Sequence, residues 1–291
     1  WEGLPIAGGA TAQYGVGSPK DQSSDYAAAL KVQENGAGTA DDVLLVAGKF
    51  LYGINNGTSG FSISHTQNIA TWNGTAWGSV DADSDPYSST AETAYVAHDI
   101  EIVGGNIYIS GYRNGTYSGT YRTFVFHKFD GTVWTRPVSA IASAFFGTGF
   151  GIYAMEAVGT NIYVGGTFTG LSGVANHLAV YDTTAGTFAA FNNFAPQSGN
   201  GAVVRTITSL GSQIVVGGSF PAVTGTSGGV ARWTGASWQG IGRNAPAIVN
   251  ALLGDVEYDG ANSRLLIGAP NNDIGGAAAA DGLATLAINS V

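Results

Sequence analysis

The chain has 291 residues, of which 44% are hydrophobic, only 11% are charged and 45 are glycine, so it can build a core but is lightly charged and rich in turns. Its net charge of −9 and its lack of any basic run exclude a nucleic-acid partner and an anionic membrane surface. The absence of cysteine excludes disulfides, thiol catalysis and thiolate metal sites, and no apolar run reaches the roughly 18 residues of a membrane span, so we expect no membrane insertion.

Residues 26–82 contain the first copy of a repeated unit of four strands. An apolar stretch at 26–32 precedes DVLLVAGKF at 42–50, and IATWNGTAW at 69–77 reads as a third strand, a tight Asn-Gly turn and a fourth strand. No apolar stripe with helical spacing is long enough to predict a helix.

The same unit recurs down the chain. It predicts blades at about 95–139, 152–194, 203–242 and 248–291, and the aromatics that begin the fourth strands are Trp77, Trp134, Phe188 and Trp238. We therefore expect a single all-β domain over residues 1–291, a five-bladed β-propeller of four-stranded antiparallel blades.

The fifth unit is irregular. Its third strand, GLATLAINSV at 282–291, is not followed by a turn and an aromatic, whereas WEGLPI at 1–6 resembles the fourth strand WQGIG at 238–242. We expect this segment to complete the last blade, in its own ring or in that of a neighbouring subunit, because closure removes exposed strand edges. The closing strand comprises Trp1, Glu2, Gly3, Leu4, Pro5 and Ile6.

The repeats resemble those of Rax2-like and delta-60-type β-propeller proteins. The resemblance rests on VGG followed by Ser or Thr and Phe, on strands such as VARW, and on turns such as NGTAW and DGTVW, in four of the five units. Such repeats belong mainly to extracellular or cell-surface proteins, so the resemblance implies a surface scaffold or an interaction role. Because the sequence begins at Trp1, we also expect that a signal peptide has been removed.

No catalytic or cofactor motif occurs in its proper context, so we expect no enzyme activity, no cofactor and no metal site. The histidines, expected at the surface or at strand ends, are His65, His98, His127 and His177. Gly-Gly pairs at 104–105, 165–166, 217–218 and 275–276 are interpreted as turn or close-packing glycines. The tryptophans that recur in the repeats are interpreted as core residues rather than sugar platforms.

Acidic residues on the innermost strands of the blades are weak candidates for a ligand site, because these strands line the channel of a propeller. They are Asp99, Glu101, Glu156, Asp255 and Glu257. Two or three of them could converge as a glycosidase pair, or they could be solvated or bind a cation. Asp81, Asp83 and Asp85 read as a hydrated acidic loop rather than a calcium site.

These features favour a non-enzymatic structural or adhesive protein outside the cell, one that self-associates into an oligomer or filament by strand exchange, or binds other surface proteins or glycans. A carbohydrate-binding propeller and a propeller glycosidase remain the alternatives. Asn56, Asn73 and Asn114 each begin an Asn-Gly-Thr sequon, which fits secretion, although Asn-Gly also suits a turn.

Overall fold

The computed structural model describes residues 15–17, 26–34, 42–50, 52–57, 60–65, 68–80, 95–116, 120–137, 151–169, 171, 176–192, 194, 202–220, 223, 229–241, 249–255, 262–269 and 283–289. These residues form strands, turns and connections, and none is helical. Accordingly, a helix that could cross a membrane is not found among them. The chain divides into two compact units, Trp1–Pro137 and Val138–Val291.

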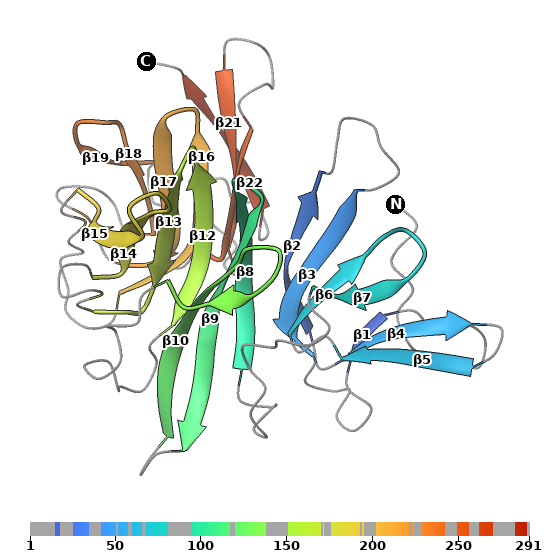
Figure 1. Ribbon diagram of the computed structural model, residues 1–291. Helices are drawn as coiled ribbons and strands as arrows, with labels where there is room; N and C mark the ends of the chain where they lie inside the picture. Colours follow the sequence, from blue (N-terminus) through green and yellow to red (C-terminus); the bar gives the residue numbers. More distant parts are fainter. Residues whose placement is uncertain are drawn as a thin grey trace. The chain divides into compact units, whose positions relative to one another are not determined.

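The first unit contains two four-stranded antiparallel sheets, and in each the strands follow one another in chain order (Figure 1). Sheet 1 consists of β2 (Tyr26–Gln33), β3 (Val43–Lys49), β6 (Ile69–Trp72) and β7 (Trp77–Ser79). Sheet 2 consists of β8 (Tyr95–Val103), β9 (Asn106–Thr116), β10 (Thr120–Phe129) and β11 (Trp134–Thr135).

A third sheet in this unit has no counterpart among the described residues of the other repeats. The loop predicted between the second and third strands of the first repeat instead contains the hairpin β4 (Tyr52–Gly57) and β5 (Gly60–His65). β1 (Gly15–Gly17) pairs with β4 to make a three-stranded sheet, and both hairpin strands contact β7.

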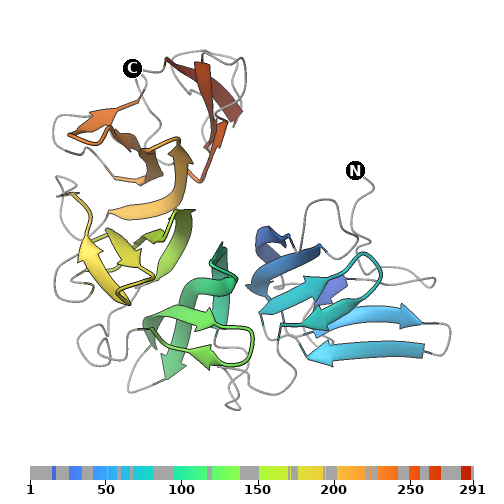
Figure 2. The same ribbon diagram turned by 45° about the horizontal axis from the view of Figure 1, so that its top comes forward.

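The second unit contains the remaining three repeats. Sheet 3 consists of β12 (Ile152–Val158), β13 (Asn161–Gly166), β14 (Leu178–Asp182) and β15 (Thr187–Ala190), and sheet 4 of β16 (Val203–Leu210), β17 (Gln213–Ser219), β18 (Val230–Trp233) and β19 (Trp238–Gly240). Sheet 5 has three strands in the described part of the chain, β20 (Ala251–Asp255), β21 (Asn262–Gly268) and β22 (Leu283–Asn289). β12 contacts β16, which contacts β20, and Figure 2 shows β12 and β16 side by side.

The predicted all-β fold of repeated antiparallel units is therefore confirmed. The segment Trp1–Ile6, predicted to complete the fifth sheet, lies outside the described residues, as do Asp81, Asp83, Asp85 and the Gly-Gly pair at 275–276.

The repeated glycines follow from how closely the strands approach. In sheets 1 to 4 the first strand has a bulge opposite a glycine of the second strand. A Cβ at this glycine would lie about 2 Å from a backbone carbonyl oxygen in the first strand or directly before it; these glycines are Gly48, Gly111, Gly166 and Gly218. In sheets 3 and 4 the residue before this glycine faces the next sheet. A Cβ at Gly165 would meet Val204, and a Cβ at Gly217 would meet Val249. Close packing is thus the correct interpretation of the pairs 165–166 and 217–218. The pair 104–105 forms a turn in which both glycines have positive φ.

An aromatic pair joins the third and fourth strands of sheets 1 to 4. The ring centroids lie 4.9 to 5.7 Å apart in the pairs Trp72–Trp77, Phe129–Trp134, Tyr181–Phe188 and Trp233–Trp238. Trp77 and Trp238 are buried, and the other three tryptophans of these pairs pack against core clusters. The prediction that these tryptophans are core residues is confirmed.

Candidate functional site

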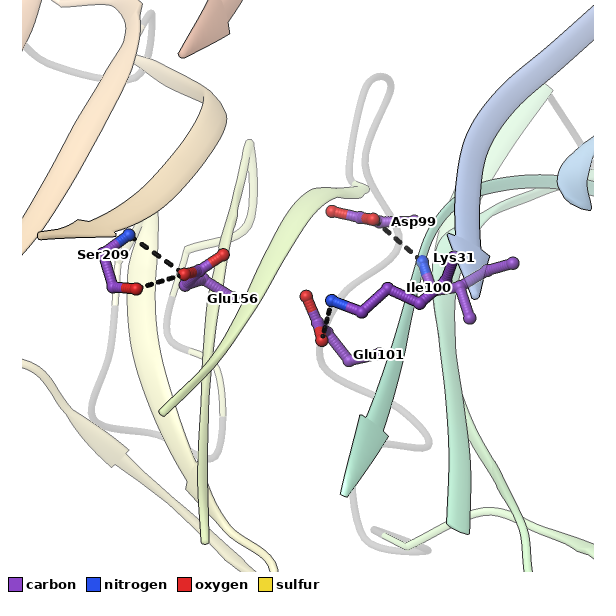
Figure 3. A network of polar contacts seen from close by, with 6 residues as sticks. All are labelled: Lys31, Asp99, Ile100, Glu101, Glu156 and Ser209. Atoms are coloured by element: carbon purple, nitrogen blue, oxygen red, sulfur yellow. Dashed lines mark hydrogen bonds and ion pairs between the residues drawn. The ribbon is translucent and has the colours of Figure 1, made fainter. Parts of the chain in front are cut away.

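The predicted acidic residues lie on first strands of the sheets, with one exception. Asp99 and Glu101 lie on β8, Glu156 on β12 and Asp255 at the end of β20, whereas Glu257 lies outside the described residues. The Asp99 carboxylate accepts a hydrogen bond of 2.8 Å from the backbone N–H of Ile100 (Figure 3). Asp99 therefore has a local backbone partner beside the bulge of β8.

Glu101 forms an ion pair with the neighbouring sheet. Its Oε2 lies 2.7 Å from Nζ of Lys31 on β2, and the Glu101 side chain is only 5% exposed (Figure 3). A buried carboxylate without a partner would carry a large desolvation cost, so the lysine compensates the charge that sheet 2 buries against sheet 1.

Glu156 has a similar place in the second unit. Its Oε1 accepts hydrogen bonds from the backbone N–H of Ser209, at 3.0 Å, and from the Ser209 hydroxyl, at 2.5 Å (Figure 3). Ser209 lies on β16, so this carboxylate links the first strand of sheet 3 to the first strand of sheet 4.

These contacts share one position of the repeat. Counted from the strand pairing, this first-strand position holds Lys31, Glu101, Glu156, Thr208 and Leu253 in the five repeats. The Thr208 hydroxyl accepts a hydrogen bond of 3.0 Å from the N–H of Gly254, just as Glu156 accepts one from Ser209. Lys31, Glu156 and Thr208 are the polar side chains at this position whose next sheet lies in the same unit. Each of them connects its own sheet to that next sheet.

The partners Lys31, Thr208 and Ser209 were not predicted as functional residues. Aligning the repeats on the glycine that faces the bulge places Lys31 and Thr208 at the same position as the glutamates, so this signal is present in the sequence. Among the described residues, no group of three His, Cys, Asp or Glu side chains could hold a metal ion.

The prediction of surface or strand-end histidines is wrong for His127. It lies inside β10, two residues before the strand ends at Phe129, and is 3% exposed. Burial, followed by the positive charge of Arg136, lowers its pKa to about 4, and its Nε2 accepts a hydrogen bond of 3.1 Å from Arg136 Nε. His177, directly before β14, has a positive φ of 62°, and its burial lowers its pKa.

A groove of 370 Å³ lies between sheets 1 and 2 in the first unit. It is lined by uncharged residues that include Gln33, Thr71, Asn73 and Phe129. Trp77 also lines it but is only 4% exposed, so little of its ring is available for stacking on a sugar. Among the described residues that line the groove, none supplies a carboxylate for acid–base chemistry.

The sequons lie in three different settings. Asn56 is in β4 and Asn114 in β9. Asn73 begins the turn between β6 and β7, where its Oδ1 accepts hydrogen bonds from the N–H groups of Thr75 and Ala76 at 3.0 and 2.8 Å. The turn therefore accounts for this asparagine, and glycosylation stays a prediction.

Comparison with known proteins gives distant structural likenesses, one of which is described here. No protein family model matches the chain. No curated protein matches it either. Among solved structures, the chain is similar to the extracellular domain of a one-component system from B. thetaiotaomicron, with 14% sequence identity and a TM-score of 0.39. The match covers 82% of this chain and 27% of that one, so this chain spans about a quarter of the other's length.

Proposed function

We propose that the protein is a non-enzymatic structural or adhesive subunit of the cell surface or extracellular space, and that copies assemble by strand exchange. The observation that carries the proposal is the strand count of the last repeat. Sheets 1 to 4 each end in a short fourth strand, whereas sheet 5 ends at β22 in the described part of the chain. The segment Trp1–Ile6 resembles in sequence the fourth strand of sheet 4, WQGIG at 238–242.

An edge strand with unpaired backbone groups is a template for another strand. β22 pairs with β21 over seven residues, from Leu283 to Asn289. It is longer than the third strands β6, β14 and β18, which pair with the fourth strands β7, β15 and β19. The N-terminal segment of a neighbouring copy would bind this edge through backbone hydrogen bonds, and repetition would generate a filament.

We further propose that the five repeats of one chain form a five-bladed propeller. The end repeats have complementary features that support this. Leu30 and Val32 on β2 are each 54% exposed, although the residue that aligns with Leu30 is buried in sheets 2 and 4, as Ile100 and Ile207. Conversely, the three atoms nearest to a Cβ at Gly268 all belong to Ala251 of the same sheet, the closest at 3.4 Å. Leu30 packed on Gly268 would repeat the packing of Leu252 on Gly217.

A structural role also agrees with how the acidic residues are used. Glu101 is neutralised by Lys31, and Glu156 accepts two hydrogen bonds from Ser209. A glycosidase needs one carboxylic acid and one carboxylate facing a sugar. Here the two best-placed glutamates instead hold neighbouring strands, which favours a scaffold over an enzyme.

The test compares the full chain with a variant that lacks residues 1–6. We expect electron microscopy and light scattering to show filaments or oligomers for the full chain and their loss in the truncated one. A variant in which six serines replace residues 1–6 controls for length and should also fail to assemble. Unchanged filaments after truncation, or a monomer in every case, would contradict the proposal.

A further inference from the structure

We infer that Tyr153, Arg205 and Asn250 form a binding site for a sugar that carries a carboxylate, namely a uronic acid unit of a glycan. The three residues lie on β12, on β16 and directly before β20, which are the first strands of sheets 3, 4 and 5. All three belong to the second compact unit. The site adds a glycan ligand to the structural role proposed above, and it uses none of the residues on which strand exchange depends.

The three residues occupy one position of the repeat, the extra residue of the first-strand bulge. The pairing register of β12 shifts at Tyr153, and that of β16 shifts at Arg205. A bulge leaves its extra residue unpaired and changes the direction in which its side chain points. Asn250 has the corresponding place in sheet 5. It directly precedes Ala251, which pairs with Gly268 just as the residue after the bulge of sheet 4 pairs with its second-strand glycine.

Hydrogen bonds between neighbouring first strands bring these positions to nearly the same level. The Thr206 hydroxyl on β16 accepts a hydrogen bond of 3.1 Å from the N–H of Leu252 on β20. Likewise, Glu156 on β12 accepts one of 3.0 Å from the N–H of Ser209 on β16 (Figure 3). In both contacts a residue meets the residue one position further along in the next repeat. Adjacent first strands are therefore offset by a single residue, which is about 3.3 Å along a strand.

The side chains at this level are accessible. Arg205 and Asn250 are exposed, and Tyr153 is half-buried. Among the described residues, Arg205 forms no ion pair. The acidic side chains on β12 and β20 lie further along their strands, because Glu156 is about 10 Å and Asp255 about 16 Å from the level of the site. The guanidinium of Arg205 is therefore available to an external anion.

Sheets 1 and 2 show that the fold does not require these particular side chains. The register of β2 shifts at Ala28, and that of β8 shifts at His98. The bulge thus accepts a methyl group as readily as a large polar side chain. Packing alone does not explain why the second unit has a tyrosine, an arginine and an asparagine at this position.

The chemistry of the three side chains suits one carboxylate on a sugar ring. The Arg205 guanidinium can donate two parallel hydrogen bonds to a carboxylate. The Asn250 amide can donate to one sugar hydroxyl and accept from another, and the Tyr153 ring can pack on the apolar face of the sugar. A single arginine balances a single negative charge, so a carboxylate fits better than a phosphate group, which carries about −1.5 to −2 at neutral pH.

The experiment measures the binding of an oligomer of galacturonic acid to the full chain by isothermal titration calorimetry. We expect binding of the acid, but not of the same oligomer with methyl-esterified carboxyl groups and not of inorganic phosphate. Arg205→Ala should weaken binding about 10-fold or more, because it removes the charge-assisted hydrogen bonds. Arg205→Lys should restore only part of the affinity, because lysine keeps the charge without the planar fork.

The matched control is Arg232→Ala, which removes the same charge from the same unit. Arg232 lies on the third strand β18 and donates a hydrogen bond to Gln239, so its loss should leave binding unchanged. Circular dichroism checks that every variant keeps the β-sheet spectrum. Selective loss of binding in the Arg205 variants supports the site. Equal weakening by both alanine variants, equal binding of the methyl ester, a preference for phosphate, or no binding of the acid by the native chain would each overturn it.

Discussion

At the scale of single residues, the buried His127 makes stability depend on pH. Its pKa in the folded chain is about 4, below the ordinary value of 6.5, so the unfolded chain binds more protons between these values. The part of the free energy of unfolding that depends on a neutral His127 is fully present above pH 6.5. It is lost as the pH falls towards 4. The shift corresponds to about 3 kcal/mol at most.

The variant His127→Gln should remove this dependence while keeping an oxygen acceptor for Arg136. We expect urea unfolding of the native chain to weaken between pH 6.5 and 4 relative to the variant, whereas the difference between the two should be constant above about pH 7.5. The same pH slope in both chains would show that His127 does not control the transition.

At the scale of strands, the tight approach of the first and second strands makes one glycine in each of sheets 1 to 4 hard to replace. A Cβ at Gly218 would lie 2.0 Å from the carbonyl oxygen of Val203, so Gly218→Ala should displace β16 from β17 and cost about 3 kcal/mol. Urea unfolding followed by tryptophan fluorescence is suitable, because Trp233 and Trp238 lie in the same sheet.

The control is the fifth repeat, where Ala269 occupies the corresponding position. Ala269→Gly should cost only about 1 to 2 kcal/mol, since it adds backbone freedom and removes one buried methyl group but creates no clash. If Gly218→Ala and Ala269→Gly lowered the free energy of unfolding by the same small amount, the backbone at the bulge could move to accept a side chain. The close approach would then not explain the repeated glycine.

The same scale shows what the sequence can and cannot predict. Alternation, Gly-Gly pairs and turns such as Asn73-Gly74 predicted the repeated strands, because these signals depend on local geometry. The hairpin β4–β5 was missed because no other repeat has a counterpart with which to align it. The links from Glu101 to Lys31 and from Glu156 to Ser209 join residues 70 and 53 positions apart, so they depend on how sheets pack. The burial of His127 was missed for the same reason.

At the scale of the whole molecule, the proposed propeller predicts that the two end repeats are energetically coupled. Leu30 and Gly268 are the large and small partners of the contact by which the ring would close. Leu30→Ala should destabilise the chain by about 2 kcal/mol, as for a core leucine, whereas a fully solvated leucine would change stability by less than about 0.5 kcal/mol.

A double-mutant cycle makes this prediction specific. Gly268→Val should also destabilise the chain, and combining it with Leu30→Ala should cost less than the sum of the two, because the smaller residue makes room for the larger one. Val133 is 46% exposed in the turn between β10 and β11 and provides the control, since Val133→Ala should be neutral and additive with Gly268→Val. Thermal unfolding at several protein concentrations measures all these variants. Strict additivity of Leu30→Ala with Gly268→Val would mean that these two residues do not meet, and the repeats would then form an open array rather than a ring.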